Sequence, residues 1–183
     1  MQRLRHLQKG SAALALLGLL IVGSMAYAGM DKCPSPSAAP QPASAVQQLT
    51  RAWADTSGSL RVNLTARETE LVIGVDDMQL ELTSEHPGYL TLLAAGSDDT
   101  SLYSLLPAKG QSLRVAVGKT ALPPPETRIG ASGPAGIGAV MAIVSDNPQD
   151  ADALLAQIKQ GGRLDISGAH GVSLLLYRER GQR

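Results

Sequence analysis

Between Ser59 and Ser145 the chain is divided into short apolar segments by turn-forming residues, and this division constrains the fold more than any other feature. Some segments alternate apolar and polar residues, which is typical of strands buried on one face. Others are continuous apolar runs, which suit strands buried on both faces. Such short strands at roughly 8–12-residue spacing favour an antiparallel sandwich or a small barrel. The alternating segments are 60–64, 78–82 and 113–117, and the continuous runs are 71–75, 89–95, 102–106 and 139–144.

Residues 148–160 predict a helix. Asp146 and Asn147 precede Pro148 and can cap the first turn, and two glycines follow at 161–162. We expect this helix to lie over an exposed sheet face. The fold predicted is therefore mainly β, an antiparallel β-sandwich or small barrel-like domain with one covering α-helix. The helix would pack through an apolar stripe made of Ala151, Leu154, Leu155 and Ile158.

Three further segments complete the predicted domain, which spans residues 45–183. Val46, Leu49 and Trp53 recur at helical spacing and predict a short helix, with Trp53 as an anchor on the domain surface. After the main helix, alternation at 164–166 and the apolar run 172–177 predict strands. The basic tail 178–183 is expected to be solvated.

The composition limits what this domain can bind. The chain has no Phe, one Trp and four Tyr, so its core must be built from aliphatic residues rather than around an aromatic-lined ligand cavity. Its 16 acidic residues all follow position 30, whereas three of the 16 basic ones precede position 10. The remainder therefore carries 16 acidic against 13 basic residues, and nucleic acid is not an expected partner.

The first 28 residues have the three-part layout of a secretory signal peptide. Residues 1–10 are basic, residues 11–22 are almost wholly apolar, and Ala26 and Ala28 place small residues where a signal peptidase requires them. We therefore expect cleavage before Gly29 and export to the periplasm. The alternative is an uncleaved helix anchored in the inner membrane, the only expected membrane contact.

A spacer is expected between this segment and the domain. Residues 29–44 are rich in Pro, Ser and Ala, a composition that cannot build a core. The single cysteine, Cys33, lies in this spacer and is a candidate for an intermolecular disulfide in an oxidising compartment, or for a solvated thiol. Asp31 and Lys32 precede it, and this charged pair argues against a lipid-attachment site.

A series of short motifs follows in a fixed order. Gly88-Tyr89-Leu90 begins an apolar strand, Leu106-Pro107 comes next, and Gly118-Lys119-Thr120 leads to Pro123. Pro134-Ala135-Gly136 then precedes an apolar run that ends at Ser145. In the order and spacing of these motifs, residues 70–148 resemble the bacterial family known as domain of unknown function 4384.

The resemblance implies that the protein belongs to the bacterial envelope, but it implies no particular activity. Domains of this family occur beside kinase and caspase-like domains, or alone behind signal peptides, and some occur near secretion or envelope systems. The family has no agreed catalytic residues, so none is transferred. Read by themselves, Gly88 and Tyr89 fit a strand entry, and Leu106 and Pro107 fit a strand end, because proline cannot donate to a ladder.

The residues offer little catalytic, metal or cofactor chemistry. His86 and His170 are the only histidines after residue 28, and neither stands at a metal-ligand spacing with Cys33. The glycine-rich stretch 130–138 has no following Lys-Ser/Thr pair and contains Pro134, which argues against a phosphate-binding loop. We therefore assign no catalytic residue, no metal and no cofactor.

Two classes of function remain. The first is a non-enzymatic, exported interaction module that binds a protein or glycan partner as an accessory to a secretion or envelope-signalling assembly. The second is a small exported hydrolase that uses His86 or His170. A toxin or immunity component of an export system is a further alternative. Possible partner-binding loops are those least explained by folding, and their residues are Pro123, Pro124, Pro125, Gly133, Pro134, Gly136 and Ile137.

The first testable prediction concerns processing. Protein recovered from an envelope fraction should begin at Gly29, because the small residues Ala26 and Ala28 define the cleavage site. Intact-mass measurement checks this. A mass that includes residues 1–28 would establish the anchored alternative instead.

Overall fold

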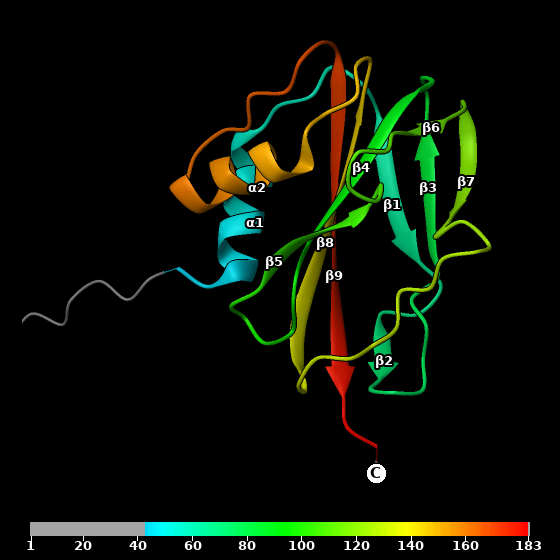
Figure 1. The fold of residues 1–183 in the computed structure, drawn as a ribbon, viewed down its shortest axis with the longest axis vertical. Helices are drawn as coiled ribbons and strands as arrows, with labels where there is room; N and C mark the ends of the chain where they lie inside the picture. Colours follow the sequence, from blue (N-terminus) through cyan, green and yellow to red (C-terminus); the bar gives the residue numbers. More distant parts are fainter. Residues whose placement is uncertain (1–42, 183) are drawn as a thin grey trace, which may run out of the picture. The chain divides into compact units, whose positions relative to one another are not determined.

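Two β-sheets lie face to face, and two helices cover the outer face of the larger sheet (Figure 1). The computed structural model describes residues 43–182. The mainly β prediction is confirmed in this part of the chain. The barrel-like alternative is wrong, because the described strands form two open sheets rather than one closed one.

The smaller sheet has three strands in the order β1-β3-β7. β1 (Val62–Ala66) and β7 (Gly118–Leu122) each pair antiparallel with β3 (Leu80–Ser84). Leu64, Leu80 and Leu82 turn inward and are buried, as the period-two alternation predicts. This sheet therefore supplies one apolar wall to the space between the layers.

The larger sheet has the order β2-β9-β8-β4-β5. Its strands are β2 (Glu70–Val72), β4 (Gly88–Ala95), β5 (Leu102–Leu106), β8 (Gly136–Ser145) and β9 (His170–Arg180). A short strand, β6 (Leu113–Val115), pairs with the first half of β4, while β5 pairs with its second half. All pairings are antiparallel except that of β2 with β9. The prediction of wholly antiparallel strands is therefore wrong at this one edge.

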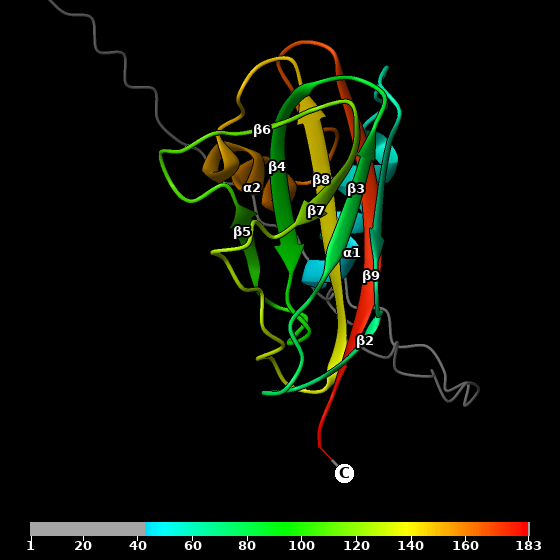
Figure 2. The ribbon, with the colours of Figure 1, turned by 90° about the vertical axis from the view of Figure 1, so that its right-hand side faces the viewer.

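The two central strands of the larger sheet, β4 and β8, are buried on both faces, and Figure 2 views the molecule from the side of the smaller sheet. Side chains of β4 and β8 alternate between two cores, as a strand requires. Leu90, Leu92 and Val140 face the smaller sheet, whereas Leu93 and Met141 face the helices. The continuous apolar runs 89–95 and 139–144 are thus explained, because neither face of these strands meets solvent.

The two helices form the third layer. α1 (Ala45–Asp55) is capped by Ser44, whose Oγ accepts from the amide of Gln47, and it buries Ala45, Leu49 and Ala52. Of the predicted stripe, Leu49 is buried, whereas Ala45 and Ala52 are buried in place of Val46 and Trp53, and Trp53 is 39% exposed. Neither helix of the described residues is long and apolar enough to span a membrane.

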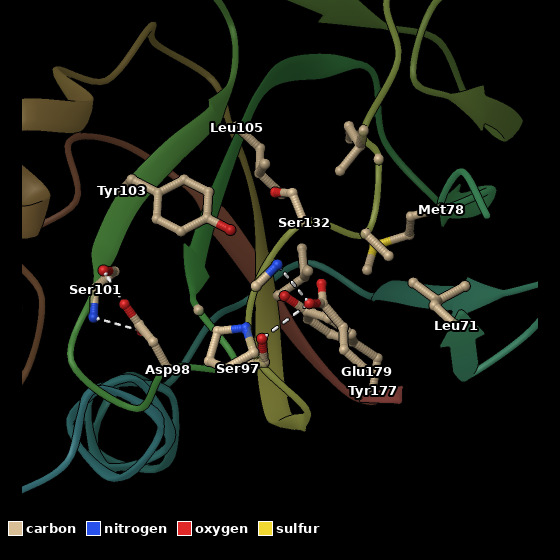
Figure 3. Close-up of a pocket in the computed structure, with 17 residues that line it drawn as sticks. Leu71, Met78, Ser97, Asp98, Ser101, Tyr103, Leu105, Ser132, Tyr177 and Glu179 are labelled. Carbon is tan, nitrogen blue, oxygen red and sulfur yellow. Dashed lines mark hydrogen bonds between the residues drawn. The ribbon is translucent and has the colours of Figure 1, made fainter. Parts of the chain in front are cut away.

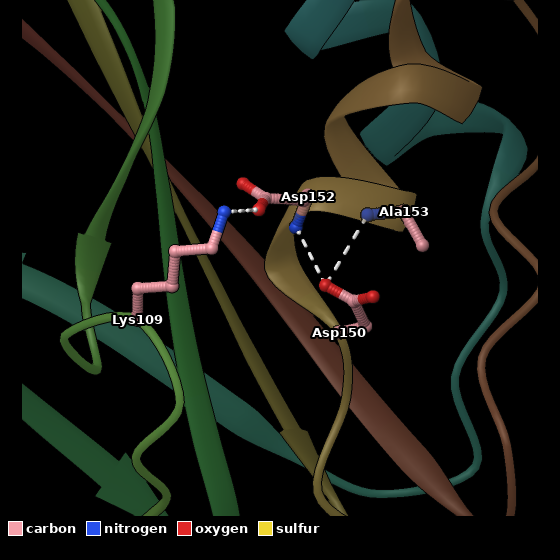
Figure 4. A network of polar contacts seen from close by, with 4 residues as sticks. All are labelled: Lys109, Asp150, Asp152 and Ala153. Atoms are coloured by element: carbon pink, nitrogen blue, oxygen red, sulfur yellow. Dashed lines mark hydrogen bonds and ion pairs between the residues drawn. The ribbon is translucent and has the colours of Figure 1, made fainter.

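α2 (Ala151–Gln160) buries Leu154, Leu155 and Ile158 against the larger sheet, which confirms a covering helix here, although two helices rather than the predicted one cover this face. It begins at Ala151 rather than Pro148, because its cap is the Asp150 side chain and not the predicted Asp146 or Asn147. Lys109 Nζ lies 2.8 Å from Asp152 Oδ2 and ties the β5–β6 loop to this turn (Figure 4). Both partners are exposed, so this ion pair contributes little to stability.

Three predicted strand segments are corrected. The run 71–75 is not buried throughout: β2 ends at Val72, Gly74 adopts a positive φ, and Val75 is 64% exposed. Val117 is 61% exposed because β6 already ends at Val115. Residues 164–166 bury Leu164 and Ile166 but belong to no strand. Edge position and turn geometry, rather than hydrophobicity, decide these segments.

Several predictions lie outside the described residues. They are the signal peptide or anchor at 1–28, its cleavage site at Ala26, Ala28 and Gly29, most of the 29–44 spacer, and Cys33.

The second testable prediction concerns the covering helix. Leu155→Asp should lower the free energy of unfolding by about 3 kcal/mol or more, because it places an unpaired charge in an apolar layer. Ala156→Asp, at the exposed neighbouring position, is the matched control and should change it little. Chemical denaturation measures both. Equal stability of the two variants would show that α2 does not depend on this contact.

Candidate functional site

A cavity of about 250 Å³ opens at one end of the sandwich, and we call it the loop-end pocket (Figure 3). The β4–β5 turn, the glycine-rich loop and the end of β9 form its polar side. Its apolar lining includes Leu71, Met78, Leu105, Ile129 and Val140. Its polar side chains are those of Ser97, Asp98, Ser101, Tyr103, Ser132, Tyr177 and Glu179.

Glu179 is the central polar group of this pocket. It is only 6% exposed and is the one charged residue among the buried side chains of the described chain. Its Oε2 accepts hydrogen bonds from Ser97 Oγ at 2.9 Å and from the Gly133 amide at 2.8 Å. No ion pair within residues 43–182 includes Glu179. The carboxylate is therefore held by neutral donors and lacks a counter-charge.

The alternation of β9 places Glu179 inside. Tyr177 and Glu179 point into the space between the sheets, whereas Arg178 and Arg180 are exposed on the other side of the strand. The prediction that residues 178–183 are solvated is wrong for Glu179, because β9 continues to Arg180. The period-two pattern of the apolar run 172–177, extended by two residues, is the sequence signal that could have located it.

The β4–β5 turn is rigidly organised at the mouth of the pocket. Asp98 accepts hydrogen bonds from the Ser101 hydroxyl and from the amides of Ser101 and Thr100, at 2.9 and 3.1 Å for the two amides. These hydrogen bonds hold the pKa of the Asp98 carboxyl well below its usual range, and the bond from the Ser101 hydroxyl lowers it most. Asp98 is therefore a second negative charge beside the opening.

Two tyrosines, Tyr103 and Tyr177, line the cavity. Burial raises the pKa of both Tyr103 and Tyr177, and the charge of Glu179 raises both further. Both phenols are thus neutral at physiological pH and keep their hydroxyl hydrogens as donors. Tyr177 is 5% exposed, whereas Tyr103 is 40% exposed and can meet a ligand directly.

The glycine-rich loop is explained by close packing around these groups. A Cβ on Gly133 would lie 2.1 Å from Ser97 Oγ, and one on Gly136 would lie 2.2 Å from the Ser97 carbonyl oxygen. A Cβ on Gly138 would lie 2.3 Å from the Tyr177 ring. The missing side chains of Gly133 in the loop and of Gly136 and Gly138 in β8 therefore make room for Ser97 and Tyr177.

The predicted partner-binding residues fall into two groups. Gly133 and Pro134 line the pocket, and Gly136 and the 49% exposed Ile137 begin β8 beside it. Pro123, Pro124 and Pro125 follow β7 and do not line the pocket. The partner-binding role of both groups stays a prediction.

The family-motif residues lie away from the pocket. Gly88 and Tyr89 begin β4, at the end opposite to Ser97, and a Cβ on Gly88 would lie 2.8 Å from the Ser145 carbonyl oxygen. Leu106 ends β5 and is buried, and Pro107 follows it through a cis peptide bond. These positions agree with strand entry and strand end.

Neither histidine of the hydrolase alternative reaches the pocket. His170 begins β9, about 30 Å from Glu179 at a rise of roughly 3.3 Å per residue. Its Nδ1 lies 3.0 Å from the Gly168 carbonyl oxygen. His86 lies in the exposed β3–β4 turn. Residues 43–182 contain no group of three or more His, Cys, Asp or Glu side chains arranged to hold a metal ion.

A wider hollow lies between the β5–β6 loop and α2, but its charged groups already have partners. Lys109 pairs with Asp152, and Asp150 accepts from the helix backbone (Figure 4). The loop-end pocket differs because its buried charge is unpaired, so it is the stronger candidate for a binding site.

Comparisons with protein-family models, with curated proteins and with solved structures found no match to this chain. The resemblance to the domain of unknown function 4384 family therefore stays a prediction, and the function must be inferred from the site.

The third testable prediction concerns the packing of Gly138 in the first half of β8. Gly138→Ala should lower the free energy of unfolding by about 1–3 kcal/mol, the usual cost of overpacking, because its Cβ would overlap the Tyr177 ring. Gly181→Ala is the matched control, since nothing lies within 4 Å of a Cβ there. Thermal or chemical denaturation compares the two. A Gly138→Ala variant as stable as the control would refute the proposed packing.

Proposed function

We propose that the protein is a non-enzymatic, exported β-sandwich that binds an envelope or secretion-system protein at its loop-end pocket. The observation that carries the proposal is the buried Glu179 carboxylate, which has hydrogen-bond donors but no counter-charge. Burying such a charge is costly for folding alone. An unpaired charged group in a cavity is instead a common feature of sites that receive a ligand.

The location of the pocket supports binding. The central strands β4 and β8 of the larger sheet are covered on both faces, so these faces are closed to a partner. The pocket lies instead among turns and loops carried by the ends of long strands. Binding groups commonly occupy such loops because the scaffold fixes their positions.

Binding is favoured over hydrolysis by the groups that line the pocket. Ser97 is its best-placed hydroxyl, but its Oγ donates to a carboxylate, which is a much weaker base than imidazole. Histidine, lysine and cysteine are absent from the lining. No specific contact favours the hydrolase alternative with His86 or His170, or the toxin or immunity alternative.

The amino-terminal sequence supports export. A periplasmic location, or an inner-membrane anchor if residues 1–28 are retained, would bring the pocket to partners in the envelope. In such a location the protein would act as an accessory to a secretion or envelope-signalling assembly.

The fourth testable prediction places a photo-crosslinking residue at Ser132, an exposed residue that lines the pocket, in the full chain in its native cells. We expect an adduct with one envelope protein. Pro134→Trp, which fills the mouth of the pocket, should abolish that adduct. Pro87→Trp is the matched control, because Pro87 is exposed at the opposite end of β4, and it should preserve the adduct.

If the adduct survives Pro134→Trp, or if Ser132 yields none while a residue on another surface does, the partner binds elsewhere. Thermal denaturation of both Trp variants verifies that they remain folded.

A further inference from the structure

The charged side chains that line the loop-end pocket all have the same sign. Its lining includes two charged residues, Glu179 and Asp98, and both are acidic. The nearest basic residues in the sequence, Arg178 and Arg180, lie on the exposed side of β9. A negatively charged ligand would therefore meet repulsion at the mouth and again at the floor.

The unpaired carboxylate also argues against a neutral ligand. Oε2 of Glu179 already accepts two hydrogen bonds, whereas Oε1 accepts none from residues 43–182. A hydroxyl of a neutral sugar could donate to Oε1 but would leave the buried charge uncompensated. A cationic donor supplies both the hydrogen bond and the missing charge, and such charge-assisted bonds are the stronger ones.

Apolar side chains of the pocket fit an aliphatic stem. Leu71 pairs with Glu179 across β2 and β9, and Figure 3 shows Leu71 and Met78 beside this carboxylate. Further apolar lining residues are Leu105, Ile129 and Val140. Lysine and arginine combine such a stem with a charged head, and they bury the stem along apolar surface. The Tyr103 ring is partly exposed and offers a face to a cation.

Resting on the proposed function, we infer that the pocket binds a basic side chain, lysine or arginine, presented by the partner protein. The charged head lies toward Glu179 Oε1, with Ser97 and Gly133 fixing that carboxylate from behind through Oε2. The stem lies along Leu71 and Met78, which line the pocket beside this carboxylate. Asp98, held charged by the β4–β5 turn, attracts the basic group to the opening.

The test uses the Gly133 amide as a reporter, because it donates directly to Glu179. Isotope-labelled full chain is titrated with Nα-acetyl-lysine methylamide, its arginine counterpart, and the neutral Nε-acetylated lysine derivative, and the Gly133 resonance is followed by NMR. The two basic probes should shift this resonance in a saturable manner. The neutral derivative should not.

Glu179→Gln keeps the size of the side chain and an oxygen for Ser97 and Gly133 while it removes the charge. It should weaken binding of the basic probes by about tenfold or more, the loss expected for a hydrogen bond to a charged group. Glu81→Gln is the matched control, since Glu81 is an acidic residue of the smaller sheet that pairs with Lys119. It should leave probe binding unchanged.

Equal binding of the neutral derivative overturns the inference, and so does an unchanged affinity in Glu179→Gln. A stronger response to glucosamine than to the lysine probe overturns it too, because it would assign the pocket to an amino sugar. If Glu179→Gln does not fold, the comparison of charged and neutral probes on the unmodified chain still decides.

An adduct at Ser132 without any response to basic probes refutes this inference alone, whereas probe binding without a pocket-dependent adduct refutes the proposed function alone.

Discussion

The burial of β8 on both faces is the constraint on which the rest of the structure depends. β8 lies at the centre of the larger sheet between β4 and β9, and residues 138–145 are all buried. Its apolar side chains point in two directions, so one covering layer cannot remove them from water. The smaller sheet covers one face and the two helices cover the other. A three-layer arrangement follows from the composition of this strand.

The same strand changes character where it enters the loop-end pocket. Gly136 and Gly138 replace the branched residues found farther along β8, and their paired residues on β9 are Glu179 and Tyr177. The space that the glycines leave is occupied by Ser97 and the Tyr177 ring. A close-packed core thus continues into a polar site without a break in the strand. The stability supplied by the core can support a buried charge that would be costly in a weaker scaffold.

Much of the fold could be predicted from local patterns. Alternation identified β1 and β3, continuous apolar runs identified β4 and β8, and capping with an apolar stripe identified α2. These predictions succeed because burial at each position follows from the period of the strand or helix. They fail at the sheet edges, at Val75 and Val117, where the end of pairing decides exposure. A hydrophobicity pattern contains no information about which strand lacks a neighbour.

The sequence by itself determined the strand-rich class, the covering helix and an amino terminus with the layout of a secretory signal. Only the tertiary structure decided that Ser97, Gly133 and Glu179, which are far apart in the chain, meet around one carboxylate. Their meeting depends on the pairing of β9 with β8 and of β8 with β4, which are long-range contacts that no local period encodes. Glu179 looks in the sequence like one acid in a basic, solvated tail. It becomes a buried charge only because β9 extends past Tyr177 and turns every second side chain inward.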